Sequence, residues 1–510
     1  MSSHNSKSYS QILKSSSLVG GSQLIRLIFG ILSTKFAAVF IGPTGVGLIG
    51  AYRSITQLGI QLSGLGINQS GVRNVAVAAG SGDQNEITRT VTILRRMCWM
   101  TGLVGAVGLA ALAFPVSRLT FGHTDYALSI ACLSLMILIT IVAQGRMAVI
   151  QGLRRISDLV RVQIFSSMAG TLISIGLYAT LGISGIVPAL LAIAIFQLGV
   201  AWWYSRKVFL QSLPISWLET FSGAKSLVGL GFAFMISGVA TTATTYAIRV
   251  LITRDFGIDN LGIYQAAFAI SGYVLNFVLA AMGADFFPRL AELSHDPREM
   301  TRLVNEQTEV GLLLATPALV ATLALAPLGI YLLYSAEFYP AVGLLRWFVM
   351  GCFLRVISWP MGFVQMAMGK KYWFILSQVF FNFLHIILVI TGLYYWGLLG
   401  AAVAFFSMYV FHVLGIRLIA GYLINFTWSA AAKRLILTQL FIIFVAFVSA
   451  LILPDLWSMV TGSLLSVIVG IYCLRQLLVR LGEEHRICRK FAKIPILKKI
   501  ITIRSKDNDS

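Results

Sequence analysis

The chain has 510 residues, of which 57% are hydrophobic and only 11% are charged, whereas soluble domains carry about 25% charged residues. This composition excludes a set of ordinary soluble domains, because most of the chain cannot face water. The formal net charge of +20 would suit nucleic acid, but the basic residues are spread over short loops between apolar runs. We therefore expect an integral membrane protein with no nucleic-acid partner.

Apolar runs of about 20 residues, the length that an α-helix needs to cross about 30 Å of hydrocarbon, recur along the whole chain. In chain order they predict spanning helices near residues 18–41, 45–67, 97–114, 126–150, 160–181, 185–204, 226–252, 261–286, 309–334, 341–366, 372–396, 398–423, 435–453 and 457–478. The expected fold is an all-α integral membrane protein with about 14 transmembrane helices.

Basic residues mark alternate connections between these helices. Because cytoplasmic loops retain Lys and Arg during insertion, these connections are expected to face the cytoplasm. They hold Arg89, Arg95, Arg96, Arg154, Arg155, Arg161, Arg206, Lys207, Lys225, Arg289, Arg298, Arg302, Lys370, Lys371, Lys433 and Arg434. An even number of spans then places both termini in the cytoplasm, where anionic membrane lipids are the expected partners of the basic tail.

The chain also repeats itself at an offset of about 215 residues. The pattern Phe-Ile-Gly at 40–42 and Gly-Leu at 47–48 matches Phe-Gly at 256–257 and Gly-Ile at 262–263. Six helices separate the matching points, so the two halves are expected to be parallel repeats, a plan typical of transporters with the substrate site between the lobes. The predicted parts are an N-lobe at 1–210, a cytoplasmic linker at 211–225, a C-lobe at 226–425, helices 13 and 14 at 426–480 and a basic tail at 481–510.

Charged side chains inside the predicted spans are nearly all positive. A cation at the middle of a membrane helix costs about 3 kcal/mol, and the predicted spans hold no deep carboxylate to offset it. The cations are Arg26, Lys35, Arg53, Arg249, Arg346, Arg355 and Arg417. We interpret them as the lining of a water-filled cavity that attracts a phosphate or an acidic sugar.

The alternative interpretation is that these side chains extend to the lipid headgroups, and it applies best to Arg249, Arg346 and Arg417. Arg26 lies about 12 Å inside its helix, at about 1.5 Å per residue. Arg26 and Lys35 are nine residues apart, which puts them on opposite faces of a straight helix. A bend at Gly30 would reconcile them.

Other motifs do not indicate a cofactor or a metal. Gly45–Gly50 has the spacing of a dinucleotide fingerprint, but no strand precedes it. The cysteines show no paired spacing. His385 and His412 are expected to make helix contacts rather than to relay protons.

Several short segments follow one another in an order that is similar to a known family, over about residues 15–423. They are Arg26 and Lys35 leading to FIGPTGVGL at 40–48, the pair Tyr52 and Arg53, FGHTDY at 121–126 and LGIYQ at 261–265. In these segments the chain resembles the Wzx-type flippases of lipid-linked oligosaccharides, among them the O-antigen and enterobacterial common antigen translocases. They form the polysaccharide transporter branch of the MATE-like (multidrug/oligosaccharidyl-lipid/polysaccharide) superfamily.

The resemblance implies a flippase that moves undecaprenyl-pyrophosphate-linked O-antigen or related units from the cytoplasmic to the periplasmic leaflet of the bacterial inner membrane by alternating access. It also implies substrate-binding roles for Arg26, Lys35, Arg53, Arg249 and Arg355, which match basic positions of the common antigen translocases. A glycan polymerase and a chain-length regulator are the further partners it suggests. Helices 13 and 14 depart from the twelve-helix pattern, and in the lipid II relatives such a pair lines a groove for the lipid tail.

Two other functions stay open at this point. A drug or cation extruder of the same superfamily would need buried carboxylates to bind cations, and the predicted spans lack them. A membrane glycan polymerase or ligase would be an enzyme with a large outer loop, and the predicted outer loops are short. We therefore expect a transporter rather than an enzyme.

Overall fold

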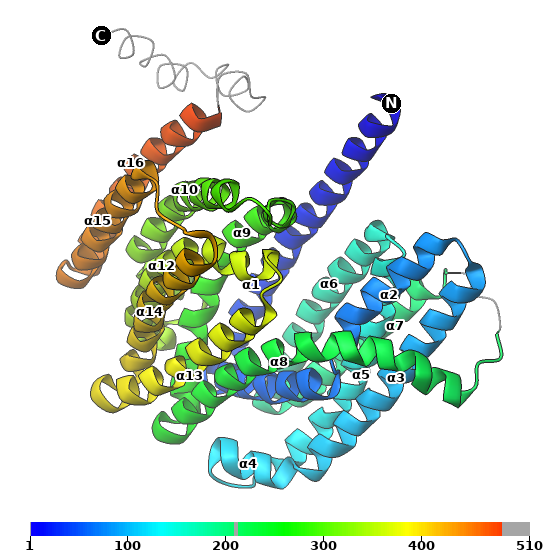
Figure 1. The fold of residues 1–510 in the computed structure, drawn as a ribbon. Helices are drawn as coiled ribbons and strands as arrows, with labels where there is room; N and C mark the ends of the chain where they lie inside the picture. Colours follow the sequence, from blue (N-terminus) through cyan, green and yellow to red (C-terminus); the bar gives the residue numbers. More distant parts are fainter. Residues whose placement is uncertain (1, 209–212, 482–510) are drawn as a thin grey trace. The chain divides into compact units, whose positions relative to one another are not determined.

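The computed structural model describes residues 2–208 and 213–481, and every regular element in these two stretches is a helix. Most of the predicted basic tail thus lies outside the described residues. In order (Figure 1), the elements are α1 (Ser2–Ser63), α2 (Ile67–Ser81), α3 (Gln84–Ala111), α4 (Ala113–Phe121), α5 (Ala127–Gly152), α6 (Ile156–Leu181), η1 (Gly182–Gly185), α7 (Ile186–Ser205), α8 (Trp217–Phe256), α9 (Ile258–Glu292), α10 (Pro297–Ala324), α11 (Ala326–Leu333), η2 (Ala336–Phe338), α12 (Ala341–Ala367), α13 (Lys371–Trp396), α14 (Leu398–Ile424), α15 (Ala430–Ile452) and α16 (Asp455–Leu481).

Ten stretches of the described residues are long and apolar enough to cross a membrane. Two of them, Gly21–Ser63 and Ile156–Ser205, have 43 and 50 residues, which is enough for two crossings each at about 20 residues per crossing. The long helices α8 and α9, with 40 and 35 residues, cover the seventh and eighth predicted spans. The predicted spans therefore fall on helices, although the ninth is divided between α10 and α11, and the all-α membrane fold is confirmed.

The first two predicted spans are joined end to end in α1. Within this helix Gly42 has non-helical backbone angles, with φ 60° and ψ −167°. Glycine reaches this positive φ without a steric penalty, and Pro43 fits the turn that follows because a first helical turn needs no N–H donor there. The break predicted between residues 41 and 45 is confirmed. The bend expected at Gly30 is not found, because Gly30 keeps helical angles.

The helix α2 was not predicted from the sequence. Its residues include Asn68, Arg73 and Asn74, so no apolar run marks it. One face of α2 is buried against α3 and α5. Gly152 of α5 lies so close to Val75 of α2 that a Cβ on Gly152 would collide with the Val75 side chain. Tertiary packing thus stabilises a helix that hydropathy alone does not indicate.

The helices group into two compact units, which we describe separately. Unit 1 consists of Met1–Ala266, Tyr331–Phe338 and Gln378–Leu393, and unit 2 consists of Ala267–Ile330, Tyr339–Ser377 and Tyr394–Ser510. Within unit 1, α3 packs on α5 and α1 on α6. Within unit 2, α12 packs on α14, and α10 packs on α15 and α16 (Figure 1).

The predicted lobe boundaries stay a prediction, because these units follow contacts rather than chain order. One local difference concerns the linker expected at 211–225. Helix α8 begins inside it, at Trp217, because Ser216 and Glu219 form a capping box that satisfies two backbone N–H groups at the helix start.

Matching residues of the two predicted repeats contact each other inside unit 1. The Thr44 hydroxyl donates a hydrogen bond to Asp259, 215 residues further along the chain. At the same offset, Gly47 and Gly262 allow α1 and α9 to touch, since a Cβ on Gly47 would collide with Ile258 and a Cβ on Gly262 would collide with Pro43. Contacts between equivalent residues are expected beside a twofold axis that relates two repeats. The α1–α9 contact therefore supports the internal repeat.

Candidate functional site

Two of the predicted cations lie near each other in unit 1. Arg53, on the second half of α1, is exposed, and Arg249, on α8, is half-buried. Arg53 lies within electrostatic range of Arg249 and of Tyr178 on α6. Among the described residues, no carboxylate oxygen lies within 4.0 Å of either guanidinium. We call this pair the Arg53–Arg249 cluster.

Hydrogen bonds orient Arg249 without neutralising it. Its Nη1 donates to the carbonyl oxygen of Gly50 at 3.0 Å, and its Nη2 donates to Oε1 of Gln265 at 3.2 Å. Both acceptors are uncharged, and the buried Nε has no hydrogen-bond partner among the described residues. An added Cβ on Gly50 would collide with the Gln265 side chain and displace the amide that holds Arg249. The guanidinium is thus held in place with its full charge and an unused donor, an arrangement that suits an anion.

Lys35 also lies in unit 1, on the first half of α1. Its Nζ donates hydrogen bonds to the carbonyl oxygen of Tyr331, at 3.1 Å, and to that of Tyr334. These carbonyls stand at the end of α11, where the helix dipole favours a cation. An ammonium group has three donors, so one remains for another acceptor.

Arg26 is exposed and contacts a different helix from Lys35. Its Nη1 donates to Oε1 of Gln163, on α6, at 3.2 Å. The separate partners of Arg26 and Lys35 agree with their positions on opposite faces of an unbent helix. The structure therefore does not bring these two cations to one common partner.

Arg355 belongs to unit 2, on α12. Its guanidinium carbon lies 5.9 Å from the centre of the Tyr409 ring on α14, a distance at the outer limit of a cation–π contact. Cys352 and His412 lie within electrostatic range of it, and no described carboxylate forms an ion pair with it. Its positive charge is therefore not neutralised inside unit 2.

Arg346 does have an acidic partner, and the interpretation of it as an unpaired cation is wrong. Its Nη2 lies 3.3 Å from Oδ1 of Asp455, at the start of α16, and the two side chains are 10% and 36% exposed. Tyr339 donates a hydrogen bond to the same carboxylate, and this bond raises the pKa of Tyr339. The sequence alone does not indicate the pair, because the two residues are 109 positions apart.

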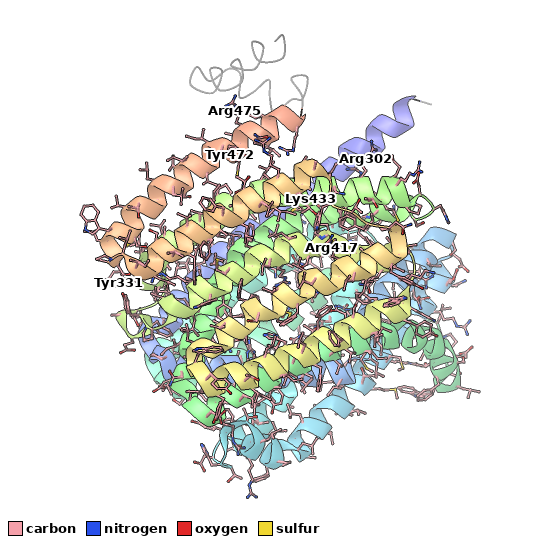
Figure 2. The ribbon with its side chains drawn as sticks, turned by 60° about the vertical axis from the view of Figure 1, so that its left-hand side comes forward. Arg302, Tyr331, Arg417, Lys433, Tyr472 and Arg475 are labelled. Carbon is pink, nitrogen blue, oxygen red and sulfur yellow. The ribbon has the colours of Figure 1, made fainter. Side chains whose placement is uncertain are left out.

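Arg417 fits the alternative of a side chain that extends to the headgroups. It is exposed near the end of α14, and Figure 2 shows it with Arg302, Lys433 and Arg475 on the helices of unit 2. Asn305 Nδ2 near the start of α10 bonds the carbonyl of Thr427, just after α14. The helix ends that hold these basic residues thus come together within unit 2.

The uncharged partners of the cations were not predicted. Gln163 and Gln265 each accept a hydrogen bond from an arginine, but neither stands near its partner in sequence. A polar amide inside an apolar span is a signal that could have identified Gln163, because such a group needs a partner in the membrane.

The chain is similar to known proteins of polysaccharide biosynthesis and to a flippase. A family model described as "Polysaccharide biosynthesis protein" matches residues 37–343. The lipid III flippase of Escherichia coli (strain K12) is 27% identical over 420 residues, which cover 78% of this chain and 95% of that protein.

Two solved structures share the fold at low sequence identity. The lipid II flippase MurJ, in an inward closed conformation, is 12% identical, has a TM-score of 0.68, and covers 92% of this chain and 99% of its own. An inward-facing multidrug resistance MATE family transporter of the MOP superfamily is 13% identical, has a TM-score of 0.64, and covers 78% of this chain and 95% of its own.

Proposed function

Because the chain belongs to the polysaccharide biosynthesis protein family, we propose that it is a flippase that moves a lipid-linked oligosaccharide across the bacterial inner membrane. The substrate class is undecaprenyl-pyrophosphate-linked O-antigen or a related unit, carried from the cytoplasmic to the periplasmic leaflet by alternating access. The similarity to the lipid III flippase along 78% of the chain and the transporter fold support this function.

The observation on which the proposal mainly rests is the Arg53–Arg249 cluster. Two guanidinium groups within electrostatic range of each other repel, and no described carboxylate offsets that repulsion. A pyrophosphate would relieve it through charge-assisted hydrogen bonds. We propose Arg26 and Lys35 in unit 1 and, separately, Arg355 in unit 2 as further contacts to the substrate, since none of them forms an ion pair with a described carboxylate.

The alternative of a cation or drug extruder is less well supported. Coupling to cations needs carboxylates inside the membrane, and two described carboxylates within the helices already have basic partners. Asp158 pairs with Arg155 and Arg161, and Glu309 pairs with Arg480 at 2.9 Å. The short outer connections likewise disfavour a glycan polymerase or ligase.

The proposed orientation of the chain in the membrane rests on the basic residues in alternate loops. We propose that both termini lie in the cytoplasm, with anionic lipids at the basic tail, and that a glycan polymerase and a chain-length regulator receive the product outside. Reporter domains fused to either end would be active only as cytoplasmic reporters. An externally accessible terminus would contradict the orientation.

The first test is the substitution Arg53→Gln. Arg53 is exposed and forms no ion pair with a described residue, so its removal should leave the fold intact. We expect cells that depend on this chain to lose most of the corresponding surface glycan, about tenfold or more, because one charge-assisted hydrogen bond to the pyrophosphate is lost. The measurement is the amount of surface glycan relative to the amount of folded protein in the membrane.

The matched control is Arg417→Gln, which removes the same charge from an exposed position in unit 2. It should leave surface glycan unchanged. Normal glycan in the Arg53→Gln strain, with normal amounts of folded protein, would contradict the proposed role of the cluster.

A further inference from the structure

A second pair of unpaired arginines lies in unit 1, on helices that do not form the Arg53–Arg249 cluster. Arg95 comes from α3 and Arg146 from α5, two helices that pack closely where Gly145 faces Cys98. The two guanidinium groups are within electrostatic range and repel each other. Both residues are half-buried, so water screens this repulsion only in part.

The hydrogen bonds available to this pair leave most of its donors unused. Nε of Arg95 and Nε of Arg146 are both buried and have no hydrogen-bond partner among the described residues. Arg146 Nη1 donates to the hydroxyl of Ser205, at the end of α7, at 3.3 Å. Arg95 makes no hydrogen bond or ion pair with any residue that the structure describes.

The neighbouring arginine on α3 shows the contrast. Arg96 donates to the carbonyl of Ile215 and to the hydroxyl of Thr220, both at 2.8 Å. It also lies 4.8 Å from the centre of the Trp217 ring. Arg96 thus has the partners of a structural arginine, whereas Arg95 has no such partner in the part of the chain that the structure describes.

We propose that Arg95 and Arg146 form a binding site for the phosphate group of an anionic membrane phospholipid. Two guanidinium forks match the several oxygens of a phosphate. The buried Ser205 hydroxyl positions Arg146, because it accepts a hydrogen bond from Nη1 and donates its own proton to the carbonyl of Trp202. Arg146 stands six residues before the end of α5, about 9 Å along the helix axis, on the side that the basic loops predict to be cytoplasmic. At this depth a half-buried arginine reaches the headgroup layer.

This proposal does not depend on the transported substrate. It assigns a lipid site to α3 and α5, while the proposed function concerns α1, α8 and α12. A failure of one therefore leaves the other intact, and the two are tested by different ligands.

The experiment uses the purified full chain in a non-ionic detergent with three probes: phosphatidylglycerol, phosphatidylcholine and inorganic phosphate. Binding is counted by native mass spectrometry and followed by the thermal unfolding midpoint. We expect phosphatidylglycerol to bind more tightly than phosphatidylcholine and its affinity to fall about tenfold in Arg95→Gln. Because Arg95 bonds no described residue, this variant should fold normally.

The matched control is Arg434→Gln, which removes one charge at an exposed position of α15. It should bind phosphatidylglycerol as the unaltered chain does. A second variant, Arg95→Lys, keeps the charge but not the planar fork. Its affinity for phosphatidylglycerol should lie between those of the unaltered chain and Arg95→Gln. Unchanged phosphatidylglycerol binding in Arg95→Gln would overturn the site, and stabilisation by inorganic phosphate alone would overturn its assignment to a lipid.

Discussion

The partners of the cations distinguish structural arginines from functional ones. Arg346 and Arg480 bind carboxylates, and Arg254 donates to the carbonyls of Arg118 and Leu119. These contacts fix helix ends. Arg53, by contrast, has no described carboxylate nearby, and this absence of compensation is what makes it a candidate for binding an anion.

At the residue scale, the ion pair between Arg346 and Asp455 predicts a stability effect. Replacing Asp455 by Asn leaves the nearly buried Arg346 without its counter-charge. Loss of a buried pair costs about 3–5 kcal/mol, but Asp455 is 36% exposed, so water reduces the expected loss to about 1–2 kcal/mol. The measurement is the loss of stability of Asp455→Asn relative to the unaltered chain, followed by thermal unfolding in detergent.

The control for this pair is a double-mutant cycle. Once Arg346→Gln has removed the charge, adding Asp455→Asn should cost much less than it does alone. Additive effects of the two substitutions would show that the ion pair contributes nothing.

At the element scale, the contact between α1 and α9 is the most informative feature. Thr44 and Asp259 bond at the offset of the repeat, and Gly47 and Gly262 permit the close approach of the two helices. If the repeats move relative to each other during transport by alternating access, we expect this contact to open.

A cysteine cross-link tests that movement. In a background without the five native cysteines, Thr44→Cys combined with Asp259→Cys should form a disulfide under oxidation. Transport should stop when the disulfide forms and return after reduction. The two single-cysteine variants are the controls, and continued transport by the cross-linked protein would contradict an opening of this contact.

At the scale of the whole molecule, the fold was predictable because hydropathy and glycine breaks are local signals. The break at Gly42 and the spans from α3 to α16 follow from runs of apolar residues. Helix α2 was not predictable, because its burial against α3 and α5, rather than its own polar sequence, stabilises it. Whether an arginine is paired could not be predicted either, because Asp455 and Gln163 lie 109 and 137 positions from their partners, and Gln265 lies on the helix that follows that of Arg249.

The most direct test of the flippase function measures whether the purified chain moves a lipid-linked oligosaccharide across a membrane. The full chain would be reconstituted in liposomes that contain an undecaprenyl-pyrophosphate-linked oligosaccharide in both leaflets, and a glycosidase would be added outside. With the unaltered chain all of the glycan should become accessible, whereas protein-free liposomes and liposomes with Arg53→Gln should expose only the outer leaflet. Equal accessibility with the unaltered chain and without protein would contradict the flippase function, and full accessibility with Arg53→Gln would contradict the role of the Arg53–Arg249 cluster.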